Sequence, residues 1–184
     1  MPRKKSPRSN WTEVKKAASR FNQPELIELL RDLYRLSEKN RNFIHARLSV
    51  GEDPIDSYRR IIWNCLYVDL FEEKEGDRIS EAEEAISEYA MAADDPRGVA
   101  ELMIHFVESG QKFTLDWGDM GERFYDSLLE MYEKALEQVL SLPEEEKEEL
   151  RERLHNLVTS SSGLGWGYHD DLGSLFSRAF PDKD

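Results

Sequence analysis

Apolar residues recur along this chain with the three-to-four-residue spacing of amphipathic helices. No segment alternates apolar and polar residues as a half-buried β-strand does. Between residues 11 and 180 the spacing predicts eight or nine helices separated by short polar breaks. The pattern therefore predicts an all-α fold without a sheet.

Four of the predicted helices have a proline at their start, namely Pro24, Pro54, Pro96 and Pro143. Proline suits the first turn of a helix because the backbone N–H that it lacks would have no partner there. Successive prolines are 30, 42 and 47 residues apart, a spacing typical of two-helix repeats. We therefore expect antiparallel hairpins stacked as an irregular α-solenoid or bundle.

Local signals predict where two of the longer helices end and begin. The helix that follows Pro96 is expected to end at Gly110, because glycine is favoured immediately after a helix. The longest helix is expected to run from about residue 120 to residue 142. Asp119 would cap it, and Glu122 would complete a capping box.

The length of 184 residues fits one ordinary domain with a single core. Residues 1–10 contain two prolines and no apolar periodicity, so we expect a disordered basic arm followed by one helical domain over residues 11–184. With neither a signal peptide nor a long apolar run in the sequence, we expect a soluble cytoplasmic protein. The single cysteine, Cys65, lies in an apolar run and is predicted to be a buried small hydrophobic residue.

The net charge of −13 conceals two regions of opposite sign. Residues 1–20 hold seven basic residues against one acidic residue, whereas the remainder holds 18 basic and 37 acidic residues. The arm residues Arg3, Lys4, Lys5 and Arg8 have four possible roles: contact with nucleic acid, with an acidic partner or with the body of the protein, or no role beyond that of a solvated tail. A body this acidic repels a phosphate backbone, so sequence-specific DNA binding is not expected.

Two segments interrupt the helical pattern with glycine, aromatic and acidic residues. One is residues 160–171, which lies where four of the ten glycines are concentrated, and the other is residues 113–125. If they meet in space, one pocket would be lined by Trp117, Asp119, Tyr125, Trp166, Tyr168, His169 and Asp170. An aromatic pocket with a few polar groups is the usual form of a small-molecule site. The alternative is that both tryptophans only close the ends of the helical stack.

No catalytic, metal or cofactor site can be assembled from the motifs. The four histidines are scattered singly, without the spacing of metal ligands. The serine-rich run at 160–162 follows a predicted helix, so it lacks the strand-to-helix turn that exposes a nucleophile. The Gly-x-Gly-x-Gly run at 163–167 also follows a helix, which disfavours a dinucleotide loop. We therefore expect no metal and no cofactor, and we favour a non-enzymatic role.

Several strings of this chain resemble a bacterial family of small helical proteins that is described only as a domain of unknown function. The strings are Pro24–Ile27, Leu33–Tyr34, Asn40–Leu48, Ala100–Met103, Trp117–Asp119, Phe124–Ser127 and Gly165–Asp170. They cover most of residues 12–175, and the two Gly-aromatic segments, which include the strings FYDS and GWGYHD, are the most specific part. The resemblance implies a helical fold and implies no activity.

The sequence leads to one main functional hypothesis and two alternatives. The main hypothesis is a non-catalytic helical interaction module, an adaptor or a regulator, whose partner is another protein and not a membrane. The first alternative is a small-ligand or enzymatic pocket formed by the loops around Trp117 and Trp166. The second is contact of the basic arm with nucleic acid or an acidic partner.

Overall fold

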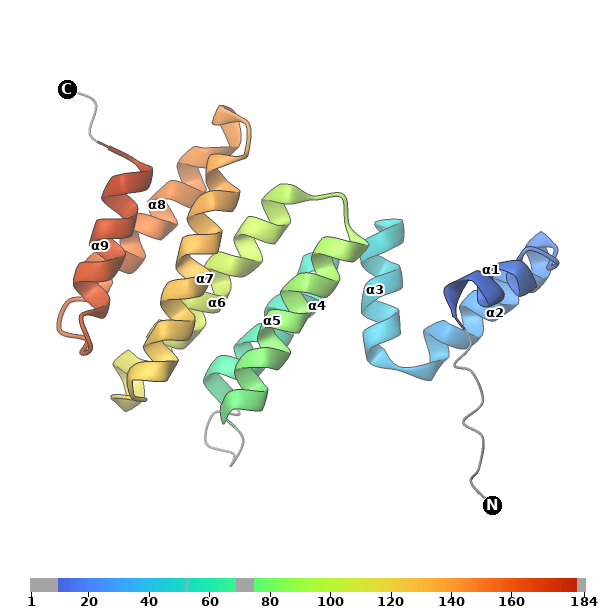
Figure 1. Cartoon of the computed structure of the whole chain (residues 1–184), viewed down its shortest axis with the longest axis horizontal. Coiled ribbons are helices and arrows are strands. Elements are labelled where there is room, and N and C mark those ends of the chain that lie inside the picture. Colours follow the sequence, from blue (N-terminus) through green and yellow to red (C-terminus); the bar gives the residue numbers. More distant parts are fainter. Residues whose placement is uncertain (1–9, 52, 69–74, 182–184) are drawn as a thin grey trace, which may run out of the picture. The chain divides into compact units, whose positions relative to one another are not determined.

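The structure of the protein is a computed structural model that describes residues 10–51, 53–68 and 75–181. These residues form nine α-helices and one short π-helix, and no strand occurs among them, which confirms the predicted all-α fold (Figure 1). The chain divides into two compact units, residues 1–44 and 45–184, and each is described by itself. The prediction of a single domain over residues 11–184 stays a prediction.

The N-terminal unit contains α1 (Trp11–Ala18), α2 (Gln23–Leu36) and the first part of α3 (Glu38–Leu48). Asn10 caps α1 by accepting a hydrogen bond from the backbone N–H of Glu13 at 3.2 Å. Asn22 and Glu25 form a reciprocal capping box at the start of α2, with distances of 3.0 and 2.7 Å. Pro24 lies in the first turn of α2, as predicted. Local signals thus mark the start of both helices.

The C-terminal unit is a stack of three helical hairpins. Its helices are α4 (Pro54–Trp63), continued by the π-helix η1 (Asn64–Val68), then α5 (Glu75–Ala92), α6 (Pro96–Trp117), α7 (Glu122–Leu140), α8 (Glu144–Ser160) and α9 (Tyr168–Ala179). The hairpins are α4–α5, α6–α7 and α8–α9 (Figure 1). Across the hairpins, α6 packs on α4 and α8, and α7 packs on α9. One layer of the unit therefore contains α4, α6 and α8, and α7 and α9 belong to the other.

The core is densest between α6 and α7, where Gly110 brings the two helices together. Gly110 is buried in the middle of α6, and a Cβ atom added to it would lie 2.5 Å from Cδ2 of Leu128. The predicted helix end at Gly110 is therefore wrong, because the missing side chain serves helix packing and not termination. The helix continues to Trp117 and is followed by Gly118, whose φ is +104°.

The start of α7 also differs from the prediction. The helix begins at Glu122, and the cap position is held by Gly121, which has a φ of +85° and no side chain to form a cap. Asp119 instead accepts a hydrogen bond from the N–H of Gly121 at 2.8 Å, which closes a tight turn two residues long. The predicted capping box of Asp119 and Glu122 is thus wrong, and Asp119 stabilises the turn that precedes the helix.

Two further sequence expectations can be compared with the described residues. Cys65 is buried in the π-helix that extends α4, which confirms its prediction as a core residue. Among the helices of the described ranges, none combines the length and the apolar character needed to cross a bilayer.

Candidate functional site

The two Gly-aromatic segments meet at one place, which we call the loop junction (residues 118–121 and 161–167). The indole N–H of Trp166 donates to both carboxylate oxygens of Asp119, each at 3.0 Å. Trp166 adopts a left-handed backbone with a φ of +62°, and the flanking Gly163 and Gly167 also have positive φ values. The glycine-rich sequence therefore shapes a loop that aims the indole of Trp166 at Asp119.

Beneath the loop junction, Tyr125 and Tyr168 form a buried aromatic pair with ring centroids 5.2 Å apart. The hydroxyl of Tyr168 donates to Oε1 of Gln111 at 3.2 Å. The amide of Gln111 donates in turn to the carbonyl of Leu157 at 3.1 Å and to Oγ of Ser160 at 2.8 Å. Burial raises the pKa of both tyrosines. Both phenols are consequently neutral. Tyr125 packs α7 against α9, and the hydroxyl of Tyr168 links α9 to Gln111 of α6 and through it to α8.

His169 is fixed to the C-terminal end of α8. Its Nδ1 lies 3.1 Å from the carbonyl oxygen of Val158 and 2.8 Å from Oγ of Ser161. The carbonyl can only accept a hydrogen bond, so Nδ1 carries the proton in this arrangement. A histidine held this way satisfies a carbonyl of the last turn of α8, which explains its position without a ligand.

The remaining members of the predicted set lie on the surface. Trp117 is the last residue of α6, its side chain is 62% exposed, and it interacts with the hydroxyl of Tyr67. Asp170 is exposed in the first turn of α9, where a negative charge suits the helix dipole. The structure thus brings together Asp119, Tyr125, Trp166 and Tyr168, with His169 beside them on α9. Ligand binding by this set stays a prediction.

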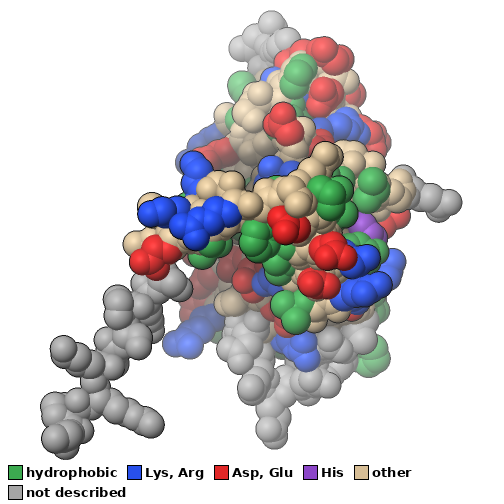
Figure 2. All heavy atoms as spheres, turned by 90° about the vertical axis from the view of Figure 1, so that its right-hand side faces the viewer, with side chains coloured by type: hydrophobic (Ala, Val, Ile, Leu, Met, Phe, Trp, Pro, Cys, Tyr) green, Lys and Arg blue, Asp and Glu red, His purple; other side chains and the backbone are tan. Residues whose placement is uncertain are grey.

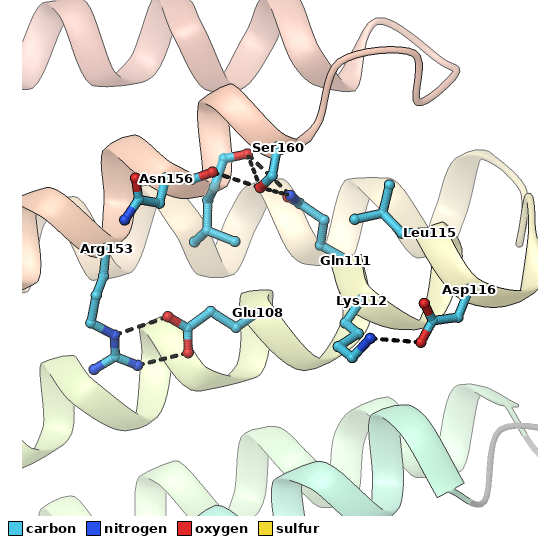
Figure 3. A pocket seen from close by; sticks show the side chains of 9 residues that line it. Glu108, Gln111, Lys112, Leu115, Asp116, Arg153, Asn156 and Ser160 are labelled. Carbon is cyan, nitrogen blue, oxygen red and sulfur yellow. Dashed lines mark hydrogen bonds and ion pairs between the residues drawn. The ribbon is translucent and has the colours of Figure 1, made fainter.

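A groove of about 270 Å³ runs between α6 and α8 (Figure 3). Nη2 and Nε of Arg153 on α8 form a bidentate ion pair with Glu108 on α6, at 2.7 and 2.9 Å. Further along α6, Lys112 donates to Asp116 at 2.8 Å, and Tyr67 donates to the same carboxylate at 2.6 Å. The charged groups around the groove are therefore already paired with one another.

The electrostatics of the groove centre on Glu108. Burial by itself would raise the pKa of this carboxyl, but hydrogen bonds and charge from His105 and Arg153 outweigh it and lower the pKa. Nε2 of His105 lies 3.1 Å from the carbonyl oxygen of Arg59, so this nitrogen is the donor, and Nδ1 faces Glu108 at 3.8 Å. Glu108 is thus held as an anion at neutral pH.

A ladder of ion pairs crosses the layer of α4, α6 and α8. Arg59 on α4 donates to Glu101 on α6 at 2.6 Å, and Arg97 donates to Glu101 at 3.1 Å and to Glu149 on α8 at 2.6 Å. The sequence reading missed this ladder. Its only local signal was the i, i+4 spacing of Arg97 and Glu101, which fits any solvated helix face.

Among the described residues, the serine hydroxyls at the end of α8 are hydrogen-bonded to backbone carbonyls. The hydroxyls of Ser160 and Ser161 donate to the carbonyls of Asn156 at 2.6 Å and of Val158 at 2.7 Å, and Oγ of Ser161 also lies 2.8 Å from Nδ1 of His169. Among the same described residues, no three His, Cys, Asp or Glu side chains lie close enough to hold a metal ion.

The large apolar side chains of α1 and α2 are exposed. Neither helix contains a buried residue. We define the α1–α2 apolar face as the eight large side chains on these helices that are at least 40% exposed, namely Trp11, Val14, Leu26, Ile27, Leu29, Leu30, Leu33 and Leu36. The view from the right of Figure 1 shows hydrophobic side chains among Lys, Arg, Asp and Glu on the surface (Figure 2). Large exposed apolar side chains in this number on two helices are typical of an interaction site.

The basic arm residues Arg3, Lys4, Lys5 and Arg8 lie outside the described residues. Their contact with nucleic acid or with an acidic partner stays a prediction from sequence.

Comparison with known proteins gives no relative for this chain. No protein-family model, no curated protein and no solved structure matches it. The resemblance to an uncharacterised bacterial helical family stays a prediction.

Proposed function

We propose that this protein is a non-catalytic interaction module that binds another polypeptide through the α1–α2 apolar face. The observation that supports this proposal is that two well-capped amphipathic helices bury none of their residues. Leu36 is 76% exposed and Trp11 is 73% exposed, which is unusual for large apolar side chains clustered on one unit. Covering these side chains with a partner removes apolar area from water, which is favourable.

The energetic gain from covering this face is of the size that association requires. Full burial of one large apolar side chain is worth about 1.5–3 kcal/mol, so covering roughly half of each of eight gives on the order of 10 kcal/mol. Association loses about 4–15 kcal/mol of translational, rotational and side-chain freedom. The face can therefore sustain a protein contact, and a tight contact needs a partner of matching shape.

The chemistry of the rest of the molecule agrees with a binding role. The buried Tyr132, Tyr168 and Gln111 are hydrogen-bonded to one another or to backbone carbonyls, and charged groups on α4, α6 and α8 are paired across helices. Such arrangements stabilise the C-terminal unit as a helical scaffold. In this proposal the N-terminal unit is the part of the protein that binds the partner.

Site-specific photocrosslinking tests the proposal. A photoreactive amino acid would replace Leu36 on the face, and in a matched control it would replace Met91 on α5, which is 62% exposed outside the face. After irradiation in cells, we expect protein adducts from position 36 and few from position 91. Equal crosslinking at both positions, or none at position 36, would contradict the proposal.

A further inference from the structure

The apolar residues of α1 and α2 repeat with the same spacing, which suggests how two copies of the chain can fit together. The leucine seam of α2 (Leu26, Leu29, Leu33 and Leu36) has spacings of three, four and three residues, and the series Trp11, Val14 and Ala18 in α1 has the first two of these spacings. Placing Trp11 opposite Leu26 therefore aligns the α1 series with the first three leucines of α2. The aligned pairs are Trp11 with Leu26, Val14 with Leu29, and Ala18 with Leu33.

Charges beside the two seams distinguish the possible pairings. Glu25 and Asp32 occupy the same flank of the α2 seam, seven residues apart, whereas Lys15 flanks the seam of α1. If two copies of α2 packed antiparallel, Glu25 and Asp32 of one copy would lie beside the same acidic residues of the other copy. A parallel pair of α1 and α2 instead places Lys15 beside Glu25. Charge thus disfavours an antiparallel α2–α2 contact and favours an α1–α2 contact.

We infer that the α1–α2 apolar face binds a second copy of this chain, with α1 of each copy packed in parallel on α2 of the other. The contact is isologous, so a two-fold axis relates the copies and the contact between α1 and α2 occurs twice. The product is a four-helix bundle built from two N-terminal units. This inference rests on the proposed function, since it names the partner for the same face.

The first test is the mass of the full-length protein in solution, measured by light scattering during gel filtration over a wide concentration range. We expect a monomer–dimer equilibrium. Leu29→Glu should raise the dimer dissociation constant by at least about tenfold, because it places a charge in the seam. Met91→Glu, which adds the same charge on exposed α5, should leave the constant unchanged.

A charge exchange tests the pairing of the helices. Lys15→Glu and Glu25→Lys should each weaken the dimer by about twofold to fivefold, as expected for an exposed ion pair. The double variant should restore most of the affinity. Glu25→Lys also removes the capping box of α2, but Lys15→Glu cannot repair that loss, so restoration reports on the contact between copies.

The outcomes separate this inference from the proposed function. A monomer at every concentration whose position 36 crosslinks to a different protein would overturn the second copy and leave the interaction module standing. A monomer whose position 36 crosslinks only within its own chain would overturn both. A dimer unaffected by Leu29→Glu would overturn the inference, because its interface would lie elsewhere. A dimer weakened by that change and rescued by the charge exchange would support both.

Discussion

Helices α2 and α7 carry similar amphipathic patterns and have opposite surroundings. On α7, eight side chains of the stripe are buried, including Phe124, Leu128 and Tyr132. On α2, the four leucines of the seam are all at least 41% exposed. The difference shows that an apolar stripe on a helix predicts that the stripe is buried. It does not predict whether the covering surface belongs to the same chain or to another molecule.

The largest expected difference between the two stripes concerns stability. Leu128→Ala removes a fully buried side chain and should lower the free energy of unfolding by about 2–5 kcal/mol. Leu33→Ala on α2 changes a side chain that is 43% exposed and should lower it by less than about 1 kcal/mol in dilute protein. Urea denaturation followed by circular dichroism measures both. Equal losses would show that α2 belongs to the same core as α7.

The close approach of α6 and α7 provides the next test. Gly110→Ala would place a Cβ atom 2.5 Å from Leu128 and should destabilise the protein by about 1–3 kcal/mol. Gly165→Ala in the loop junction is the matched control, because no atom lies within 4 Å of its added Cβ and its φ is not positive. Thermal unfolding of both variants measures the difference. If Gly110→Ala is neutral, the two helices are not locked by this contact.

The ion pair between α6 and α8 should give the protein an acid-sensitive component. The pKa of Glu108 is lower in the folded state than its ordinary value, so its contribution is fully present above the ordinary carboxyl pKa and is lost as pH falls through the folded pKa. The contribution of Glu108 to the free energy of unfolding is about 1 kcal/mol after solvent screening. Glu108→Gln should flatten stability against pH in the acid range, whereas Glu148→Gln on the exposed side of α8 should not. A Glu108 variant with the acid profile of the parent protein would contradict the role of this pair.

The smallest expected effect concerns the loop junction. Asp119→Ala removes the acceptor of the Trp166 indole on an exposed surface, so the loss of stability should be within about 1 kcal/mol. The readout is tryptophan fluorescence, in which quenching by iodide should increase as Trp166 is released. Asp170→Ala, on the exposed first turn of α9, should leave the quenching unchanged. An identical response in both variants would mean that Asp119 does not hold the indole.

The helices themselves could be predicted from the sequence because their signals are local. Proline at Pro24, Pro54 and Pro96, together with the apolar spacing, placed the helix starts without knowledge of the fold. Gly110 was misread because its role depends on Leu128, a residue on another helix. The start of α7 was misread for a similar reason, since Gly121 and Asp119 form a turn that mimics a cap.

The candidate site was only partly predictable. The composition of the loop segments suggested that they meet, and the bond between Trp166 and Asp119 connects them. The groove and the ladder of Arg59, Glu101 and Arg97 depend on the stacking of α4, α6 and α8, which no sequence spacing encodes. The exposure of α2 could not be predicted either, because the same leucine spacing occurs in helices that are buried and in helices that are exposed.

Hydrogen exchange measured at several protein concentrations tests the central claim most directly. If a second copy covers the α1–α2 apolar face, the amides of residues 23–36 should exchange more slowly as concentration rises. The amides of residues 96–117, which belong to the core of the C-terminal unit, should be protected equally at every concentration. Exchange of residues 23–36 that is independent of concentration would contradict the claim.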